Sequence, residues 1–288
     1  MQSSGDQQRS GWQGTLELAF DVDGARTRLA QQRHVGPLLV QRPFYPEPGA
    51  ASAAGHAEAC HVYVIHPPGG VVGGDQLQLA VTLAPRAQVL LTTPAAGKFY
   101  RSAAGRLAQL LQTFTVTDAT LEWLPQENIF YPDSRVRLTT RVHLSGASRF
   151  IGWEISCLGL PAQQQTLASG AAHQAFELWH ADAPLLLERL HLHGAALSAR
   201  WGLAGYGSLG TLLACQATEQ HLKEARSLLA AINCTDMEVA CTLLDGVLCC
   251  RVAAMRADQL KRIFIQLWSA LRPLLLGRSA SAPRIWAT

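Results

Sequence analysis

Short stretches of alternating apolar and polar residues, separated by turn residues, fill the first two thirds of this sequence. Residues 15–20 and 27–30 flank Asp23-Gly24, a dipeptide typical of hairpin turns. Residues that alternate with a period of two point to opposite faces of a sheet. The pattern returns at 60–65, 77–83, 88–93, 110–116, 120–124, 135–144, 150–157, 176–180 and 185–193. It predicts a mainly β body, and the lack of a repeat of fixed period argues against a propeller.

The last third of the sequence has a helical period. Residues 219–232 and 258–271 each place apolar side chains on one face of a helix. Asp258 suits the cap of the second helix, Pro273 its end and Gly277 the position beyond that end. We therefore expect two helices to pack on the β body late in the chain, followed by an extended tail.

The composition is that of a globular protein that buries a large core. Of 288 residues, 48% are apolar and only 16% are charged, so a partner is expected to cover part of the surface. The 24 basic and 21 acidic residues give a net charge of +3 without a block of like charge, which makes nucleic acid a poor partner.

The start of the sequence is not expected to act as a signal peptide. Residues 1–11 are polar and are expected to form a disordered lead, and residues 12–288 to form a single domain. No apolar run is long enough to span a membrane. The seven cysteines form no C-x-x-C pair and are expected to be free thiols. A cytoplasmic protein, not associated with a membrane, is the prediction.

The segment 66–75, HPPGGVVGGD, is the most unusual in the sequence. Two prolines fix an extended approach, and four glycines allow backbone angles closed to other residues. The spacing is not that of a dinucleotide-binding loop, and no helix pattern follows that could meet a phosphate. A rigid turn system is one interpretation. A narrow backbone passage with His66 and Asp75 at its edges is the other.

Other motifs combine charged residues with apolar ones. Lys98 and Arg101 follow a glycine, but the Walker pattern is absent, so a partner contact or a solvated loop is expected. Glu122 and Glu154 each lie in an apolar strand, where a carboxylate is paired, exposed or a ligand for a cation. Cys157, on the opposite strand face from Glu154, is more often a core thiol than a ligand.

Two further patterns are weaker. Arg189, His191 and His193 share one strand face, where a solvated surface is expected unless a third metal ligand lies nearby. The sequence contains no G-x-S-x-G, no H-E-x-x-H and no signature of a catalytic cysteine, which lowers the odds of an enzyme.

Taken in order, these blocks resemble the UreD family of urease accessory proteins, called UreH in some organisms. The resemblance rests on HPPGGVVGGD (66–75), TTPAAGKFYRS (92–102), LEWLPQENIFY (121–131) and GWEISCLGLPA (152–162), followed by LWSALRP (267–273) and PRIWAT (283–288). It extends from about residue 12 to the last residue.

The resemblance implies a fold, partners and a task. The fold is a mainly β, β-helix-like strand-rich body with two α-helices in the C-terminal third. The implied partners are a UreF-like protein, a UreG-like GTP-hydrolysing nickel carrier and urease apoprotein. GTP is then bound by the partner and not by this chain, which holds no tight cofactor and only transient Ni²⁺. Nickel is expected to pass through an internal tunnel to urease.

The resemblance and the residue types together give two sets of candidates. The candidates for a nickel conduit are His66, Asp75, Glu122, Glu127, Glu154 and Cys157. The candidates for motif or partner contacts are Lys98, Tyr100, Arg101, Tyr131, Trp268 and Arg272. No fixed metal site is expected, because scattered oxygen and imidazole ligands release Ni²⁺ more readily than a closed soft site.

The leading hypothesis is thus a non-enzymatic scaffold that conducts nickel for urease maturation. Two alternatives remain: a purely structural clamp that opens urease without contacting nickel, and a β-rich enzyme whose site follows no known motif.

Overall fold

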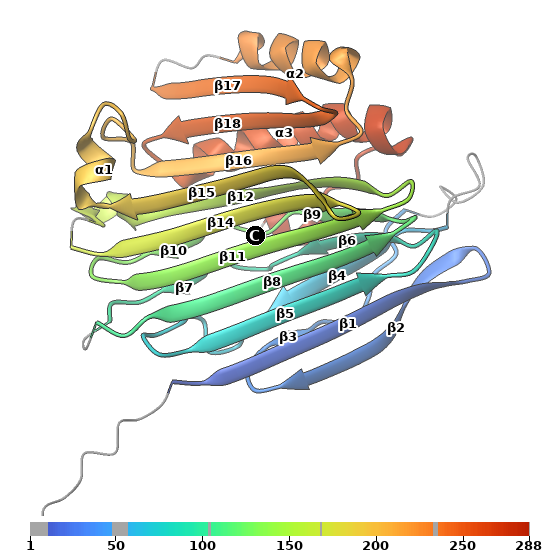
Figure 1. Ribbon diagram of the computed structural model, residues 1–288, viewed down its shortest axis with the longest axis horizontal. Coiled ribbons are helices and arrows are strands. Elements are labelled where there is room, and N and C mark those ends of the chain that lie inside the picture. The colour runs from blue at the N-terminus through green and yellow to red at the C-terminus, as the bar shows by residue number, and fades with distance from the viewer. Residues whose placement is uncertain (1–10, 48–56, 103–104, 168, 233–235, 288) are drawn as a thin grey trace, which may run out of the picture.

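Two β-sheets lie face to face and are wound mainly as a β-solenoid, as predicted (Figure 1). The computed structural model describes residues 11–47, 57–102, 105–167, 169–232 and 236–287. The predicted disordered lead falls outside these ranges except for Gly11. Gly11 lies against the backbone of Gly74, so closely that a Cβ atom on Gly11 would be 2.1 Å from the Gly74 carbonyl carbon. The first described residue is therefore fixed on the 66–75 segment.

The first sheet has seven strands. Its order is β15 (Ala183–His193), β14 (Ala171–His180), β11 (Arg135–Ser145), β8 (Ala108–Thr117), β5 (Gln76–Leu83), β1 (Gln13–Asp23) and β2 (Arg26–Val35). The five strands from β14 to β1 pair in parallel, whereas β15 and β2 are antiparallel strands at the two edges.

The second sheet continues past the first. Its main order is β17 (Met237–Leu244), β18 (Val247–Ala254), β16 (Ser208–Cys215), β12 (Arg149–Leu160), β9 (Thr120–Trp123), β6 (Gln88–Thr92), β4 (Cys60–Ile65) and β3 (Leu39–Val40). Three short strands adjoin β12: β10 (Asn128–Phe130), β7 (Gly97–Phe99), which pairs with β10, and β13 (Gln165–Thr166). The strands β4, β6, β9 and β12 pair in parallel, one from each successive coil.

The coils differ in length, which explains why the sequence shows no fixed repeat. On the first sheet one coil separates Gln76 from its partner Gln109. The next coil separates Ala108 from its partner Val136, and it contains fewer residues. The insertions lie in the connections between the sheets and leave the ladders in register. A solenoid needs equivalent strands to pair, but it does not need equal loops between them.

The described residues also form three α-helices and two short 3₁₀-helices: α1 (Gly194–Ser198), η1 (Pro161–Gln163), α2 (Glu219–Ala231), α3 (Ala257–Leu276) and η2 (Arg284–Ala287). The two predicted late helices are thus confirmed. The prediction was wrong in three details. Arg256, not Asp258, caps α3, and Pro273 lies inside its last turns instead of ending it. The tail contains η2 and is not fully extended.

Each side of the second sheet faces a separate hydrophobic core. Val89, Leu121 and Phe150 point between the two sheets into the solenoid core. Their neighbours Leu90 and Ile151 point outward into a core formed with α2 and α3. Because both faces of the sheet are covered, β12 is buried along nearly its whole length.

The cysteines correct one expectation. Cys241 and Cys250 lie directly opposite on β17 and β18 and are joined in a disulfide, so they are not free thiols. Cys60, Cys157, Cys215 and Cys249 are free and buried, as expected. In the part of the chain that the structure describes, no helix combines the length and the apolar character needed to cross a lipid bilayer.

Candidate functional site

A cavity of about 440 Å³ lies inside the solenoid, where the strands of the second sheet bend toward the short strands β7 and β10. Thr93 to Lys98 form its wall at one bend and Pro125, Gln126 and Asn128 at the next. In the preceding coil it is lined by His66, Pro67, Gly69 and Val71. The prolines at these bends cannot donate to a ladder, which ends regular pairing there. The cavity therefore follows from the corner of the coil.

The floor of this cavity carries a column of buried polar side chains. Gln112 on β8 donates from Nε2 to Thr140 Oγ1 on β11 at 2.9 Å, and Thr140 donates to the Glu154 carboxylate on β12. One step further, Ser156 donates to Gln174 Oε1 at 2.9 Å. All five side chains are buried inside a core that is otherwise apolar. Such a polar column is costly unless its groups are paired with one another or serve a ligand.

Glu154 lies between two spaces of the interior. It lines the large cavity on one side and a small pocket of about 20 Å³ on the other. Burial raises its pKa to about 7, although the hydrogen bond from Thr140 acts in the opposite direction, and the negative charge of Glu188 adds to the rise. Near neutral pH this carboxyl group is therefore divided between its protonated and ionised forms.

The small pocket reaches the seam between the two sheets. It is lined by Glu188 of β15, the edge strand of the first sheet, and by Thr211 of β16 in the second sheet. Thr211 donates to one oxygen of Glu188 at 3.3 Å, and Arg251 contacts the other at 2.8 Å. The small pocket is thus lined by two carboxyl groups, those of Glu154 and Glu188. Sequence analysis missed Glu188, although its place on the apolar face of β15, with Leu186 and Leu190, was a usable signal.

His66 and Asp75, at the two ends of the 66–75 segment, differ in role. His66 lines the cavity, and burial lowers its pKa despite the nearby charge of Asp75, so the imidazole is neutral near pH 7. The Asp75 carboxylate accepts the backbone N–H of Trp12 at 2.8 Å and of Val72 at 2.9 Å. Asp75 therefore ties the turn together, and its oxygens are already occupied.

The glycines of the 66–75 segment allow close approach. A Cβ atom on Gly70 would lie 2.1 Å from the Tyr100 ring, and one on Gly73 would lie 2.3 Å from Ser102 Oγ. Val71 continues the ladder of β7 through a bridge to Phe99. The segment is thus a tightly packed corner of the coil that also forms part of the cavity wall.

Glu122 lies on the opposite side of the second sheet from the cavity. Both its oxygens contact Arg272 of α3, the shortest at 2.8 Å, and Oε2 also accepts the Trp268 indole N–H at 2.7 Å. Arg272 also contacts Glu47 at 2.7 Å, which accepts a hydrogen bond from His61 at 2.8 Å. Burial opposes the charge of Arg272, but Glu122 and Glu47 more than compensate and raise its pKa.

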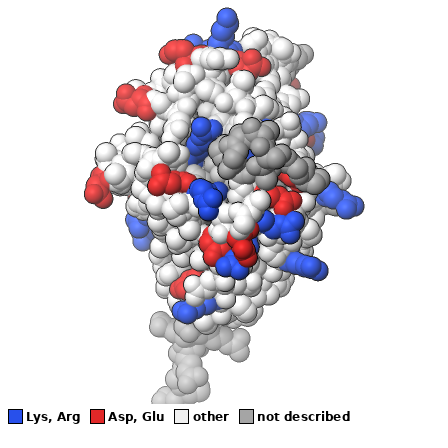
Figure 2. All heavy atoms as spheres, turned by 90° about the vertical axis from the view of Figure 1, so that its right-hand side faces the viewer, with Lys and Arg blue, Asp and Glu red and all other residues white. Residues whose placement is uncertain are grey.

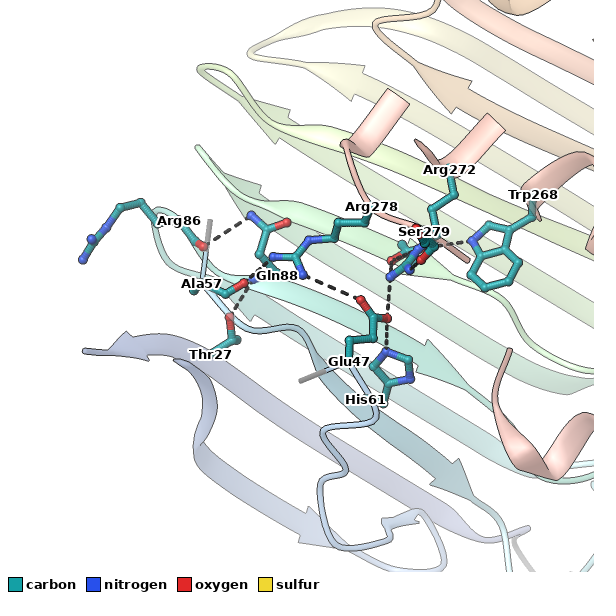
Figure 3. A network of polar contacts seen from close by, with 11 residues as sticks. Thr27, Glu47, Ala57, His61, Arg86, Gln88, Trp268, Arg272, Arg278 and Ser279 are labelled. Carbon is teal, nitrogen blue, oxygen red and sulfur yellow. Dashed lines mark hydrogen bonds and ion pairs between the residues drawn. The ribbon is translucent and has the colours of Figure 1, made fainter. Parts of the chain in front are cut away.

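This buried network fixes α3 on the solenoid. Its carboxylates, Glu47 and Glu122, are balanced by Arg272 and by Arg278, whose Nη1 lies 3.6 Å from Glu47 (Figure 3). Trp268 and Arg272 are fully buried, so their contacts are made within this chain. The network anchors a helix, and both oxygens of Glu122 are taken up by its contacts with α3.

The remaining candidates lie in two places. Glu127 is half-buried, and its charge reaches Cys157 and Lys261 on the outer side of the sheet. Cys157 belongs to the core beneath α3, and burial raises its pKa, so it is a thiol at neutral pH. Lys98 forms part of the cavity wall.

Tyr100, Arg101 and Tyr131 come together at the surface. The two tyrosine rings meet edge to face, with their centroids 4.8 Å apart. All three residues line an open surface hollow together with Asp133. This aromatic and basic patch lies next to the 66–75 corner, because Tyr100 covers Gly70.

Comparison with known proteins identifies the family. The sequence model described as UreD urease accessory protein matches residues 13–287. The chain is 41% identical to the urease accessory protein UreD of Klebsiella aerogenes over 280 residues, 97% of this chain and 98% of that protein. The chain belongs to the UreD family. It is also similar to UreD of Alcanivorax borkumensis, at 42% identity over 96% of this chain and 93% of that protein, and to UreD of Escherichia coli, at 39% over 97% and 98%.

Charged side chains of both signs are mixed on one face of this UreD-family chain (Figure 2). Figure 2 shows Lys and Arg interspersed with Asp and Glu over the face that it presents, without a patch of one sign. Nucleic-acid binding requires a concentrated basic surface. On this face charge is scattered, as the sequence predicted.

Proposed function

We propose that this UreD-family chain acts in urease maturation as a non-catalytic subunit that conducts Ni²⁺ through its interior toward the urease active site. Its partners in this proposal are UreF-like and UreG-like accessory proteins and urease apoprotein. GTP is bound by the UreG-like partner, and this chain holds nickel only transiently. The family assignment supports the role in maturation, and the interior of the solenoid supports the route.

The observation that carries the route is the position of Glu154. It is the residue that lines both the large cavity and the small pocket, with His66 in the cavity wall and Glu188 beyond the small pocket. Imidazole and carboxylate oxygen are both ligands for Ni²⁺, and each alone binds it weakly. A series of separate weak ligands allows the ion to move on, whereas a closed cluster would retain it.

In this proposal the ion loses its water between the two spaces. The cavity of about 440 Å³ has room for an ion with several water molecules, whereas the pocket of about 20 Å³ holds roughly one. Moving a bare dication into an apolar core is very costly. Between the cavity and the small pocket, the Glu154 carboxylate supplies an oxygen ligand in place of the lost water, and its negative charge offsets the charge of the ion.

The protonation of Glu154 fits this task. With a pKa of about 7, the group is protonated about half of the time near neutral pH when no ion is near. An arriving dication stabilises the carboxylate and releases the proton to water. The buried column thus carries no permanent unpaired charge, and Glu154 becomes negatively charged when the ion arrives.

Nickel delivery in cells tests the proposal. Glu154→Gln keeps the shape of the side chain and removes its charge, and Glu17→Gln on the exposed outer face of β1 is the matched control. At limiting nickel, we expect the nickel content and activity of urease to fall several-fold with Glu154→Gln and to stay unchanged with Glu17→Gln. Co-purification of the accessory partners must be equal for both variants. Asp75 is a poorer test, because its replacement releases two backbone N–H groups.

The same experiment separates the conduit from a structural clamp. A clamp that never contacts nickel depends on the surface and on stability, so it predicts normal urease loading for Glu154→Gln as long as the assembly forms. Normal loading by both Glu154→Gln and Glu154→Leu, with the assembly intact, would contradict the conduit.

A further inference from the structure

Three histidines come together on the outer face of the first sheet, away from the cavity. His191 and His193 follow one another on the exposed face of β15, and His173 lies on the same face of β14. The pairing register places His173 directly opposite His191. The third imidazole that the H-x-H pattern lacked in the sequence is therefore supplied by the neighbouring strand.

The distances between the rings suit a shared ion. The centroids of His173 and His191 are 4.0 Å apart, and those of His191 and His193 are 4.8 Å apart. An ion with metal–nitrogen bonds of about 2.0–2.1 Å and tetrahedral geometry holds its imidazole centroids roughly 5 Å apart. The backbone thus already holds the three rings at nearly the spacing that such a site requires.

From this juxtaposition we propose that His173, His191 and His193 form a surface site for a borderline divalent cation such as Ni²⁺ or Zn²⁺. Imidazole is the side chain that these ions share as a ligand. Two ligands two residues apart on a strand and a third on the next strand leave the fourth position open to water, so the ion can be exchanged.

The side chains must turn for the site to form. Among the described residues, no three ligating groups already converge at ion-binding geometry, because His173 and His191 are stacked. Both rings are exposed, and exposed side chains change rotamer within nanoseconds at small cost.

The surrounding charges set the strength of the site. Arg137 pairs with His173 across the β11–β14 ladder, and its charge repels a dication. Arg141 and Arg189 are both held by Glu177, at 3.0 and 2.8 Å, which directs part of their charge away from the histidines. The site is therefore a weak, exchangeable one, suited to collecting an ion at the surface and not to storing it.

Equilibrium dialysis of the full chain without a polyhistidine tag, against NiCl₂ at pH 7.5, tests the site. If the isolated chain is unstable, its complex with the proposed UreF-like partner is used. His191→Ala removes the central imidazole, and His34→Ala removes one exposed imidazole from β2 as the matched control. We expect His191→Ala to weaken one binding equivalent at least ten-fold and His34→Ala to leave it unchanged.

A gain of affinity provides the second readout. Arg137→Gln removes the repulsive charge and should tighten the same equivalent several-fold, most clearly at low salt. At pH 5.5 the equivalent should be lost, because protonated imidazoles do not bind metal. Equal nickel binding by the wild type and His191→Ala, or equal losses in His191→Ala and His34→Ala, would overturn the site. The measurement needs no urease, so its failure leaves the proposed conduit untouched.

Discussion

Two buried glutamates on neighbouring strands show how one residue type serves opposite purposes. Glu122 faces outward from β9 and is surrounded by donors from α3, which contact both of its oxygens. Glu154 faces inward from β12, accepts a hydrogen bond from the Thr140 hydroxyl and lies between the large cavity and the small pocket. The first carboxylate fixes a helix to the solenoid, whereas the second retains an oxygen that an ion can reach.

The difference lies in the supply of compensating charge. Arg272 accompanies Glu122 into the outer core and offsets part of the cost of burying its charge. Glu154 has no Arg or Lys among its contacts in the described part of the chain, and its charge is relieved by protonation instead. A paired carboxylate is permanently committed, and a protonated one remains available.

The largest expected effect comes from breaking the outer network. Arg272→Ala leaves Glu47 and Glu122 buried without their common cation, which should reduce the free energy of unfolding by about 3–5 kcal/mol. Chemical denaturation measures this loss. Arg262→Ala, on the exposed side of the same helix, is the control and should cost little. A similar small loss for both variants would mean that the network does not anchor α3.

The second effect is the pH dependence that Glu154 imparts. Because its pKa is about 7 in the folded chain and near 4.5 when unfolded, the folded state retains a proton that the unfolded state has lost. Stability should therefore decline as the pH rises from about 4.5 to 7 and level off above that. The decline is on the order of 3 kcal/mol relative to Glu154→Gln, which lacks the titrating group. Parallel unfolding curves for the two proteins between pH 5 and 8 would contradict the raised pKa.

A smaller effect isolates one contact of Glu122. Trp268→Phe keeps most of the aromatic packing but removes the indole N–H that Glu122 accepts at 2.7 Å. We expect a loss of about 1–3 kcal/mol in the free energy of unfolding, the usual contribution of a hydrogen bond to a charged group. In the Glu122→Gln background the same substitution should cost less, and an unchanged cost would show that the contact is not charge-assisted.

The smallest effect concerns the hydroxyl beside Glu154. Thr140→Val removes the donor that lowers the pKa of Glu154. The pKa of Glu154 should therefore rise further, by less than about one unit. To measure this pKa, the free energy of unfolding of Thr140→Val is compared with that of the double variant Thr140→Val/Glu154→Gln as a function of pH. The midpoint of their difference reports the pKa of Glu154. Thr115→Val, on the exposed face of β8, is the control and should leave the midpoint in place.

Much of the fold could be predicted from the sequence. The period-two stretches gave most strands, and β4 was predicted with its observed bounds, Cys60–Ile65. The two late helices were predicted from their apolar faces. Less regular elements were missed: β16 and β17 carry weak alternation, and β7 and β10 are too short to leave a pattern.

The candidate site was predicted only in part. His66 and Glu154 were among the candidates, and they line one cavity. Glu122 was a candidate for the same reason as Glu154, yet it lies beyond the sheet, under α3. The conduit residues as a set stay a prediction, since only the transport of nickel can test them.

The sequence by itself determined the strand-rich class, the late helices and the family, because alternation, helical spacing and the order of the motif blocks are local properties of the chain. It also determined that Glu154 and Trp153 point to opposite faces of one strand. Only the tertiary structure decided which of those faces meets the cavity. The strand β12 is buried on both sides, so hydrophobicity does not distinguish inside from outside, and the answer depends on α3, which is distant in sequence.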